Sequence, residues 1–330
     1  MQIRELNPAE NRQDLAAVYP AFAQWANDYT PGLPEIGESR LRLWSESSYR
    51  QQKKAYGAFT DEHATEAVAM AFFRYELDKN LDLTSLSLLV PAAAKAGGAA
   101  IMLFEELKRE TVELGRKRMS IGFAETEDPD AYIERLGGAK YTDTAISSTL
   151  DLSAIDRAQY AAWAEPSAKN SEYTLTRWVG SCPDELAESY CRAQDAMADA
   201  PLGTFEYEYA EHDVERLRFA EGLTRRHGIV EHVQAAVAPD GNIAGFHILA
   251  AYPDEPSILD VWDTGVTRQH RGHGLGLRLK ASAALWLLEE RPSSRIARTF
   301  NNDENHWMLA VNRTLGYEQP IRFLGYEIAL

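Results

Sequence analysis

Residues 258–280 read ILDVWDTGVTRQHRGHGLGLRLK. The part that ends at Val266 is rich in β-branched and aromatic residues, which favours a buried strand. From Leu275 onward, apolar residues recur at spacings typical of a buried helix face. The glycines between these two parts allow backbone N–H groups to point into one concavity, and the start of the following helix adds a partial positive charge. The stretch therefore predicts a strand, a glycine-rich turn and a helix that together bind a phosphate or pyrophosphate.

The distribution of charge supports an anion site at this turn. The chain has 50 Asp and Glu against 34 Lys and Arg, a formal net charge of −16, yet no acidic residue occurs between positions 264 and 288. The basic residues of that window are Arg268, Arg271, Arg278 and Lys280, with His270 and His273 beside them. The overall negative charge argues against nonspecific binding to nucleic acid and is compatible with a cationic amine as substrate.

The spacing of the turn distinguishes it from two other phosphate-binding motifs. A P-loop requires Lys followed by Ser or Thr after its last glycine, and the chain has Leu277 and Arg278 there. A dinucleotide-binding fingerprint belongs in a first βαβ unit and needs a third glycine where Leu277 stands. The pattern Arg271-x-x-Gly274-x-Gly276 instead resembles the pyrophosphate-binding signature of the GNAT superfamily of acyl-CoA-dependent N-acyltransferases.

Length and composition indicate a soluble cytoplasmic protein of two domains. The chain has 330 residues, of which 45% are hydrophobic and 25% charged, as in ordinary globular proteins. It has no apolar run of the ~18 residues that span a bilayer, and its first residues lack the apolar core of a signal peptide. Cys182 and Cys191 form no disulfide framework, and no Cys/His cluster has zinc spacing. We therefore expect no metal, no nucleic acid and no membrane as partners, and a monomer or homodimer.

Strand and helix patterns repeat along the chain. The first half predicts helices over 12–25, 38–53, 95–116 and 131–136, and strands over 3–6, 56–60, 67–77, 81–90, 119–124 and 141–150. The second half predicts helices over 183–197, 214–226, 275–288 and 305–315, and strands over 173–179, 233–238, 243–252, 258–266, 295–300 and 321–330. The positions of Val90, Lys95, Gly98 and Ala100 correspond to those of Val266, Arg271, Gly274 and Gly276. This internal repeat predicts two copies of one fold.

Several motifs extend the resemblance to most of the second half. They are Trp178-x-Gly180, Pro183-Asp184-Glu185-Leu186, Ala200-Pro201-Leu202-Gly203, Asp263-Thr264, His270-Arg271-Gly272-His273, Asn305-x-x-Met308 and Val311-Asn312-x-x-Leu315-Gly316-Tyr317. Together they resemble the tandem GNAT acyltransferases of the mycothiol synthase type. The resemblance implies an α/β (α+β) protein with two tandem GNAT folds, each a mixed, mostly antiparallel sheet flanked by helices. It predicts a degenerate N-terminal GNAT domain over 1–150, a linker over 151–170 and a catalytic domain over 171–330.

The resemblance also implies the site that binds the co-substrate, acetyl-CoA or another short acyl-CoA. The backbone N–H of Val266 is expected to meet the thioester carbonyl. The pyrophosphate is expected on the amides of Arg271, Gly272, His273, Gly274, Leu275 and Gly276. Asn305 matches a residue that contacts CoA, although an N-cap of the following helix explains an Asn there equally well.

A carboxylate is required to take the proton from the amine. Asp260 matches the fourth-strand base of the family, and strict alternation along the strand places it on one face with Trp262, Thr264 and Val266. Asp263 would then point to the other face and play a structural role. We expect Asp260 to be the base, with Asp263 as the alternative.

The proton donor to the leaving thiolate is open. Many family members have a Tyr where this chain has Asn312, and Tyr317, Tyr252 or water could replace it. Tyr207 and Tyr209 are weak candidates for contact with the acceptor, and His247 is more simply a satisfied histidine of the sheet. The predicted function is transfer of an acetyl or short acyl group to a primary amine of a small molecule. The alternative is a CoA-binding pseudoenzyme with a sensing or scaffolding role.

Overall fold

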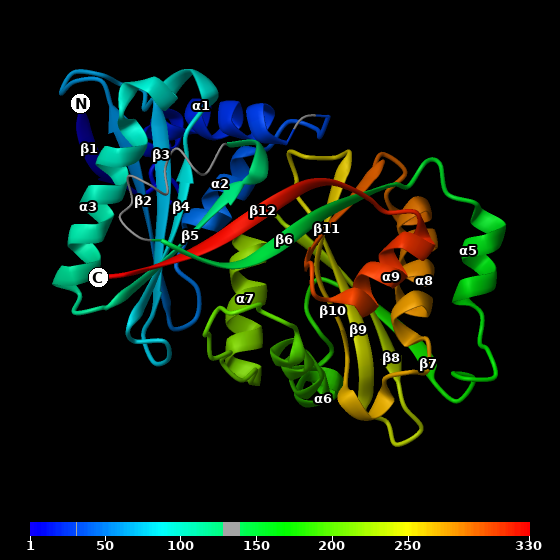
Figure 1. The fold of residues 1–330 in the computed structure, drawn as a ribbon. Helices are drawn as coiled ribbons and strands as arrows, with labels where there is room; N and C mark the ends of the chain where they lie inside the picture. Colours follow the sequence, from blue (N-terminus) through cyan, green and yellow to red (C-terminus); the bar gives the residue numbers. More distant parts are fainter. Residues whose placement is uncertain (31, 128–138) are drawn as a thin grey trace. The chain divides into compact units, whose positions relative to one another are not determined.

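The computed structural model describes residues 1–30, 32–127 and 139–330. The helix predicted over 131–136 lies outside the described residues. The α-helices (α), 3₁₀ helices (η) and strands follow one another in the order β1 (Gln2–Leu6), α1 (Arg12–Tyr29), α2 (Glu38–Ser45), β2 (Gln51–Phe59), β3 (Ala69–Glu76), β4 (Leu83–Leu89), η1 (Ala92–Gly97), α3 (Ala99–Glu113), β5 (Arg118–Ala124), η2 (Glu125–Glu127), β6 (Lys140–Asp151), α5 (Arg157–Ala164), β7 (Thr174–Val179), α6 (Asp184–Gln194), η3 (Asp195–Asp199), α7 (Val214–Arg226), β8 (Val230–Val237), β9 (Ile243–Ala251), β10 (Ile258–Val266), η4 (Arg268–His270), α8 (Leu275–Glu290), β11 (Ile296–Asn302), α9 (His306–Leu315) and β12 (Glu318–Ala329). Figure 1 labels the α-helices and strands.

The chain forms two compact units that are not contiguous in sequence. The N-terminal unit consists of Met1–Ala145, Leu202–Glu208 and Ile321–Leu330, and the C-terminal unit of Ile146–Pro201 and Tyr209–Pro320. Each unit is a mixed sheet with helices on its two faces, which confirms the predicted fold class.

The N-terminal unit has the strand order β1-β2-β3-β4-β5-β12. All neighbouring strands are antiparallel except β4 and β5, which run parallel. Alternate residues of the central strands face α3 on one side and α1 and α2 on the other, as Phe73 and Phe72 do (Figure 1). The two helical layers therefore each cover one apolar face of the sheet.

The C-terminal unit repeats this plan with the order β11-β10-β9-β8-β7. Its strands are antiparallel except for the parallel pair β10 and β11. The face that carries Leu249 and Leu259 packs on α8, and the face that carries Phe246 and Ile248 packs on α6 and α7. The parallel pair thus occupies the same place in both units.

The ends of the predicted domains differ from the units observed. The last strand, β12, passes into the N-terminal unit, where Phe323 to Ala329 pair with β5, although 321–330 was assigned to the C-terminal domain. The second part of β6, from Ile146 on, belongs to the C-terminal unit. Short-range patterns cannot show this, because the same strand pattern fits the edge of either sheet.

Two further predictions need correction. The expected linker contains helix α5, whose Tyr160 is buried against α8 and donates a hydrogen bond to the carbonyl of Leu315. The helix expected over 38–53 ends at Ser45, and strand β2 begins at Gln51.

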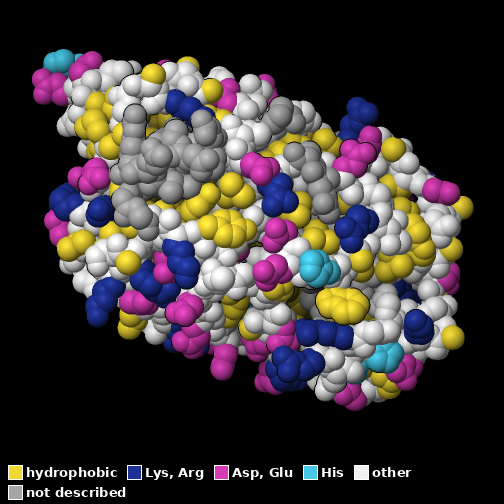
Figure 2. Space-filling view, viewed as in Figure 1, with side chains coloured by type: hydrophobic (Ala, Val, Ile, Leu, Met, Phe, Trp, Pro, Cys, Tyr) yellow, Lys and Arg dark blue, Asp and Glu magenta, His cyan; other side chains and the backbone are white. Residues whose placement is uncertain are grey.

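In the described part of the chain, no helix is long and apolar enough to cross a membrane. On the face shown in Figure 2, basic side chains lie in small groups between acidic ones.

Candidate functional site

Strands β10 and β11 separate part-way along their length. They pair in parallel from Ile258 with Ile296 to Asp260 with Arg298, although β10 continues to Val266 and β11 to Asn302. The backbone of β10 beyond Asp260 therefore has lost its partner on this side.

A bulge lies in β10 where the strands separate. Val261 pairs with Leu249 in β9 and Thr264 with His247, so β10 holds one more residue than β9 over this interval. The extra residue interrupts strict alternation. Val261 packs toward α8, and the hydroxyl of Thr264 bonds the ring of His247 on that same side, 2.8 Å away.

Trp262 and Asp263 both lie toward α6 and α7 as a result. Trp262 packs against the core formed by α6 and α7. The charge of Asp263 acts on Tyr190 of α6, and that of His212 before α7 acts on Asp263. Asp263 therefore lies on the face toward α6 and α7, and Thr264 lies on the face toward α8. The expectation that Asp260, Thr264 and Val266 share one face and that Asp263 lies on the other is wrong.

The glycine-rich turn presents backbone amides at the start of α8. Gly272 and Gly274 have φ values of 84° and 75°, in the left-handed region that favours glycine. Gly274 is the N-cap of α8, and no side chain among the described residues caps this helix. The first N–H groups of α8, from Leu275 and Gly276 on, therefore have no intrahelical acceptor and carry the positive end of the helix dipole.

The basic side chains of the turn are held by an acid from another element. Asp199 at the end of η3 bonds Arg268 at 2.7 Å and Arg271 at 2.7 Å, and these contacts hold the pKa of its carboxyl below the ordinary value. Arg271 also donates from Nε to the carbonyl of Val266, 3.0 Å away. The positive charge predicted from the acid-free window is thus partly balanced within the folded unit.

The backbone N–H of Val266 points into the separation between β10 and β11. Thr267 N–H donates to the carbonyl of Ala244 at 2.9 Å, toward β9. Because successive N–H groups of a strand point to opposite sides, the N–H of Val266 points away from β9, toward the separation. It is available to a carbonyl oxygen placed there.

Asp260 lies in a buried ion pair. Its side chain accepts hydrogen bonds from Arg298 Nε at 3.0 Å and from Arg298 Nη2 at 3.2 Å, and the residue is 6% exposed. A carboxylate bound in this bidentate way is stabilised in its charged form. These two hydrogen bonds hold the Asp260 side chain in place and leave it little freedom to approach an amine.

Asp263 has a different environment. Burial raises the pKa of its carboxyl, and the nearby His212 opposes this effect. Glu231 of β8 lies close enough for its charge to interact with Asp263, and burial raises the pKa of Glu231 to about 7. A half-buried carboxylate with a raised pKa beside a strand separation is a candidate proton acceptor.

Solved structures of other proteins have a fold similar to this one. No protein-family model matches the chain, and no curated protein matches it in sequence. A tandem GNAT protein from the clavulanic acid biosynthesis pathway is similar at a TM-score of 0.82 and 19% identity, over 99% of this chain and 98% of that one. A GCN5-related N-acetyltransferase from Sphaerobacter thermophilus is similar at a TM-score of 0.64 and 15% identity, over 99% and 95% of the two chains.

The chain has a tandem GNAT fold. In GNAT terms, β10 and β11 are the fourth and fifth strands of the C-terminal copy, and β4 and β5 those of the N-terminal copy. The resemblance stated from sequence is confirmed at the level of fold. Identities this low do not transfer a substrate or a site residue.

Buried amide groups beside the GNAT separation fit the polar arm of an acyl-CoA. Asn312 of α9 is fully buried and donates to Asn301 of β11 at 2.7 Å, while its Oδ1 has no hydrogen-bond partner among the described residues. Asn302 Nδ2 at the end of β11 is also buried without a partner in this part of the chain. Such atoms are costly unless a ligand or water satisfies them, and the pantetheine arm of CoA carries amide donors and acceptors.

The other residues singled out from the sequence lie in several different environments. Asn305 caps α9, since its side chain accepts from Met308 N–H at 3.2 Å, which is the alternative explanation for this residue. Tyr207 lies in the N-terminal unit, where its hydroxyl donates to Glu76 at 2.8 Å. Tyr252 and Tyr317 are both buried, and burial raises the pKa of Tyr317. Cys182 and Cys191 are buried, and burial raises the pKa of each thiol.

The N-terminal GNAT copy has a matching cradle, and its parallel strands stay paired over more residues than those of the C-terminal copy. Gly98 caps α3 with φ 76°, as Gly274 caps α8. Strands β4 and β5 stay paired over five residues, up to Ser87 and Gly122. Beyond this point the buried carboxylate of Glu127 accepts from the N–H of Ala124 at 2.9 Å. The edge of β5 that lines the separation of the N-terminal unit is thus bound by the chain itself.

The basic residue of the N-terminal cradle also bonds within the unit. Lys95 Nζ donates to the carbonyl of Glu127 at 2.7 Å and lies 5.0 Å from the ring centroid of Tyr29. Burial raises the pKa of the Glu127 carboxyl to about 7. In the N-terminal copy, the carboxyl of Glu127 therefore occupies the separation, and the N–H of Ala124 and the amine of Lys95 are already bonded to Glu127.

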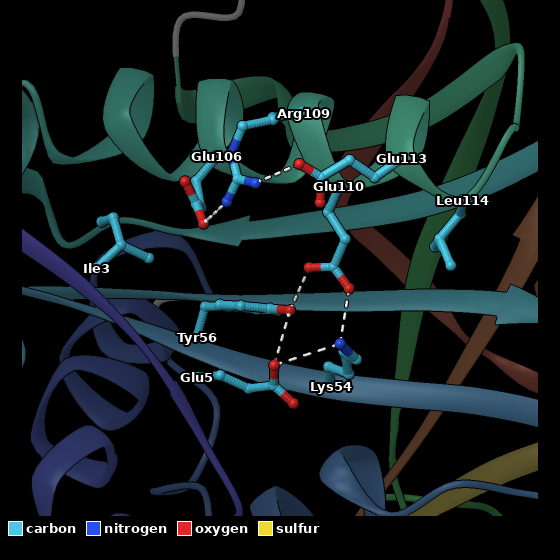
Figure 3. A pocket seen from close by; sticks show the side chains of 9 residues that line it. All are labelled: Ile3, Glu5, Lys54, Tyr56, Glu106, Arg109, Glu110, Glu113 and Leu114. Carbon is cyan, nitrogen blue, oxygen red and sulfur yellow. Dashed lines mark hydrogen bonds and ion pairs between the residues drawn. The ribbon is translucent and has the colours of Figure 1, made fainter.

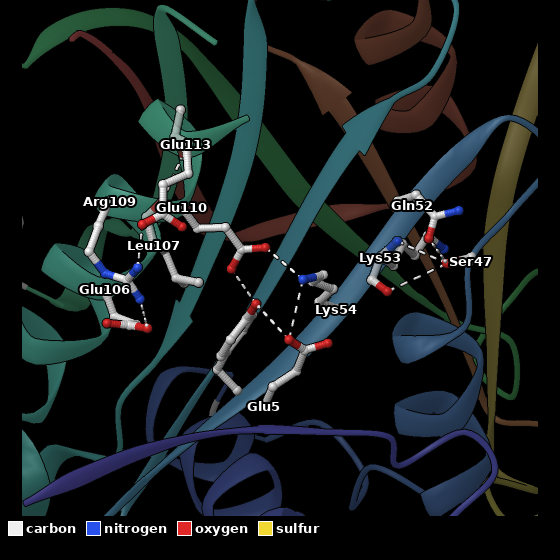
Figure 4. Close-up of polar contacts among 12 residues, drawn as sticks. Glu5, Ser47, Gln52, Lys53, Lys54, Glu106, Leu107, Arg109, Glu110 and Glu113 are labelled. Carbon is white, nitrogen blue, oxygen red and sulfur yellow. Dashed lines mark hydrogen bonds and ion pairs between the residues drawn. The ribbon is translucent and has the colours of Figure 1, made fainter. Parts of the chain in front are cut away.

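The N-terminal unit also has a hollow of about 380 Å³ between β1, β2 and α3 (Figure 3). Its charged side chains bond one another: Lys54 Nζ donates to Glu110 at 2.7 Å and to Glu5 at 3.2 Å, and the Tyr56 hydroxyl donates to the same two carboxylates. Arg109 likewise joins Glu106 and Glu113 on α3. Figure 4 shows these paired contacts together. They join α3 to the edge of the sheet, which explains the cluster structurally.

No group of three or more His, Cys, Asp or Glu in the described ranges is arranged to hold a metal ion.

Proposed function

We propose that the protein is an acyl-CoA-dependent N-acyltransferase that transfers an acetyl or other short acyl group to a primary amine of a small molecule. The observation that carries this proposal is the combination, in one unit, of separated parallel strands and an uncapped glycine-rich helix start. The amides from Gly272 to Gly276 would hold the pyrophosphate. The unpartnered atoms of Asn302 and Asn312 would bind the arm that leads to the thioester.

We assign the base to Asp263 instead of Asp260. Asp263 has a raised pKa and no ion-pair partner among the described residues, whereas Asp260 is bound by Arg298. With Glu231 nearby, Asp263 gives the α6 and α7 side of the separation a negative potential, which attracts an ammonium group. Asp263 would take the proton from that ammonium, and the N–H of Val266 would stabilise the negative oxygen that develops on the acyl carbonyl.

The C-terminal unit is the proposed site of turnover. From Val261 onward β10 no longer pairs with β11, whereas in the N-terminal unit Glu127 binds the edge of β5 that faces the separation. The N-terminal unit would then serve as a scaffold. We propose that the protein acts in the cytoplasm as a monomer or homodimer.

Mass spectrometry of the purified protein for bound CoA species, followed by a thiol-release assay with a panel of small amines, tests this function. We expect acetyl-CoA or a short acyl-CoA to be retained and at least one amine to accelerate thiol release. Binding of CoA without thiol release from any amine would support the alternative, a CoA-binding protein without turnover. Asn312 favours that alternative to the extent that it cannot donate a proton as a Tyr would.

A further inference from the structure

Lys280 is a buried amine without a polar partner. It lies in α8, is 3% exposed, and its Nζ has no hydrogen bond within the described ranges. The ring centroid of Tyr317 lies 4.8 Å from Nζ. A buried ammonium without a partner is costly, so an apolar residue of the same length would stabilise this fold better. The position calls for a functional explanation.

Its neighbours place Lys280 behind the bulge of β10. The charge of Lys280 acts on His247 of β9. The His247 ring bonds the hydroxyl of Thr264 at 2.8 Å and also the backbone of Asp263. Thr264 and Asp263 belong to the part of β10 that has lost its pairing with β11. Lys280 and Asp263 thus lie near the same segment of backbone, on opposite faces of the sheet.

Acyl transfer from a thioester creates a thiolate, and a thiol of ordinary pKa, near 8.5, leaves more readily when an acid protonates it. Asn312 has no acidic proton. Tyr317 is a poor acid near neutral pH because burial raises its pKa. Burial lowers the pKa of Lys280 to about 7, which matches this task. Other titratable groups that face α8 include His247 of β9, His232 of β8, whose ring centroid lies 5.4 Å from that of Trp286, and Tyr160 of α5, whose hydroxyl bonds the carbonyl of Leu315.

We propose that Lys280 is the proton donor to the thiolate that leaves from the acyl-CoA. The C–S bond breaks with its electron pair on sulfur, and an N–H proton of the Lys280 ammonium passes to that sulfur. The N–C bond forms as the C–S bond breaks, and two protons leave the nitrogen: Asp263 takes the first and releases it to water, and the second leaves the tetrahedral adduct to water. Lys280 is then neutral and regains a proton from water, so the products are the amide, the free thiol and one net proton. This assignment rests on the proposed function and adds the acid that sequence comparison leaves open.

The test compares the wild type with Lys280→Met, which keeps the length and removes the charge, and with Lys117→Met at an exposed position of the N-terminal unit. We expect kcat of the wild type to fall above about pH 7 as Lys280 loses its proton. Lys280→Met should lose this basic limb and lower kcat roughly 10²-fold, within the usual range for an acid catalyst. Its KM for acetyl-CoA should change little and its Tm should rise. Lys117→Met should behave as the wild type.

The possible contrary outcomes differ in what they overturn. If Lys280→Met keeps both kcat and the basic limb, Lys280 is not the acid. If its Tm falls and the basic limb persists, Lys280 has a structural role only. If the wild type releases no thiol from acetyl-CoA to any amine or to water while binding it, the proposed function itself fails, and the role of Lys280 fails with it.

Discussion

Arg298 binds both carboxylate oxygens of Asp260 from the neighbouring parallel strand, with Nε 3.0 Å and Nη2 3.2 Å from them. The two residues form the last pair in the register of β10 with β11. The ion pair therefore marks the point where the strands begin to separate. It gives Asp260 a place in the architecture of the site, and it supports our proposal that Asp263, at the bulge, is the base.

Replacement of Asp263 by Asn should remove the base. We expect Asp263→Asn to lower kcat by about 10²–10⁴-fold near neutral pH, because a carboxamide cannot accept the amine proton. In the wild type, kcat should fall as pH drops below the raised pKa of Asp263, since the carboxyl becomes protonated. That acidic limb should be absent in the variant. A pH–rate profile measured at saturating acetyl-CoA checks both effects.

The matched control is Asp260→Asn. It should keep the acidic limb and show its effect in thermal unfolding, because it weakens a buried ion pair. If the limb disappears in Asp260→Asn and persists in Asp263→Asn, the two roles are reversed.

Removal of Arg298 should destabilise the C-terminal unit. Arg298→Met leaves the buried carboxylate of Asp260 without its bidentate partner, which typically costs about 3–5 kcal/mol in free energy of unfolding. The variant also loses the contact of the guanidinium with the ring of Phe300, 5.6 Å away. Denaturant unfolding followed by circular dichroism measures the loss.

The double variant Asp260→Leu with Arg298→Met separates the cost of burying an unpaired charge from the cost of lost packing. It should recover much of the lost stability, because no charge then remains buried without a partner. A double variant as unstable as Arg298→Met alone would show that the pair acts through its shape and not through its charge.

The stability of the N-terminal unit should depend on Glu127. Burial raises the pKa of this carboxyl to about 7, above its value in the unfolded chain. The folded state therefore binds more protons than the unfolded state between about pH 4.5 and 7, so the contribution of Glu127 to stability is lost as pH rises through this window. Glu127→Gln stays neutral and retains an oxygen for the N–H of Ala124.

Thermal unfolding at pH 5 and pH 8 compares the two proteins. We expect similar Tm values at pH 5 and a higher Tm for Glu127→Gln at pH 8. A variant less stable than the wild type at pH 8 would indicate that the charged carboxylate is favoured in the folded unit.

The features that could be predicted from sequence are those fixed by nearby residues. The glycines at 272 and 274 adopt left-handed φ values, and the repeat that links Gly98 to Gly274 places each at the N-cap of its helix. Backbone freedom and helix starts depend on a few consecutive residues. The two copies of the fold therefore follow from the spacing of such signals.

The features that escaped prediction depend on register between strands. Asp260 meets Arg298, and Asp199 meets Arg271, only after distant segments have folded together. The bulge changes which residues share a face, which is why alternation counted from Asp260 assigned Asp263 to the other face. The place of β12 in the N-terminal unit is a further long-range choice.

The central claim is that the C-terminal cradle holds the acyl-CoA, and the repeat provides a matched pair of variants to test it. Gly274→Glu and Gly98→Glu introduce the same carboxylate at equivalent helix N-caps, with φ values of 75° and 76°. Isothermal titration of acetyl-CoA into each folded variant, with folding verified by circular dichroism, is the most direct measurement. We predict that Gly274→Glu abolishes the binding that supports turnover and that Gly98→Glu leaves affinity and turnover as in the wild type. Unchanged affinity in Gly274→Glu, together with lost binding in Gly98→Glu, would contradict the account.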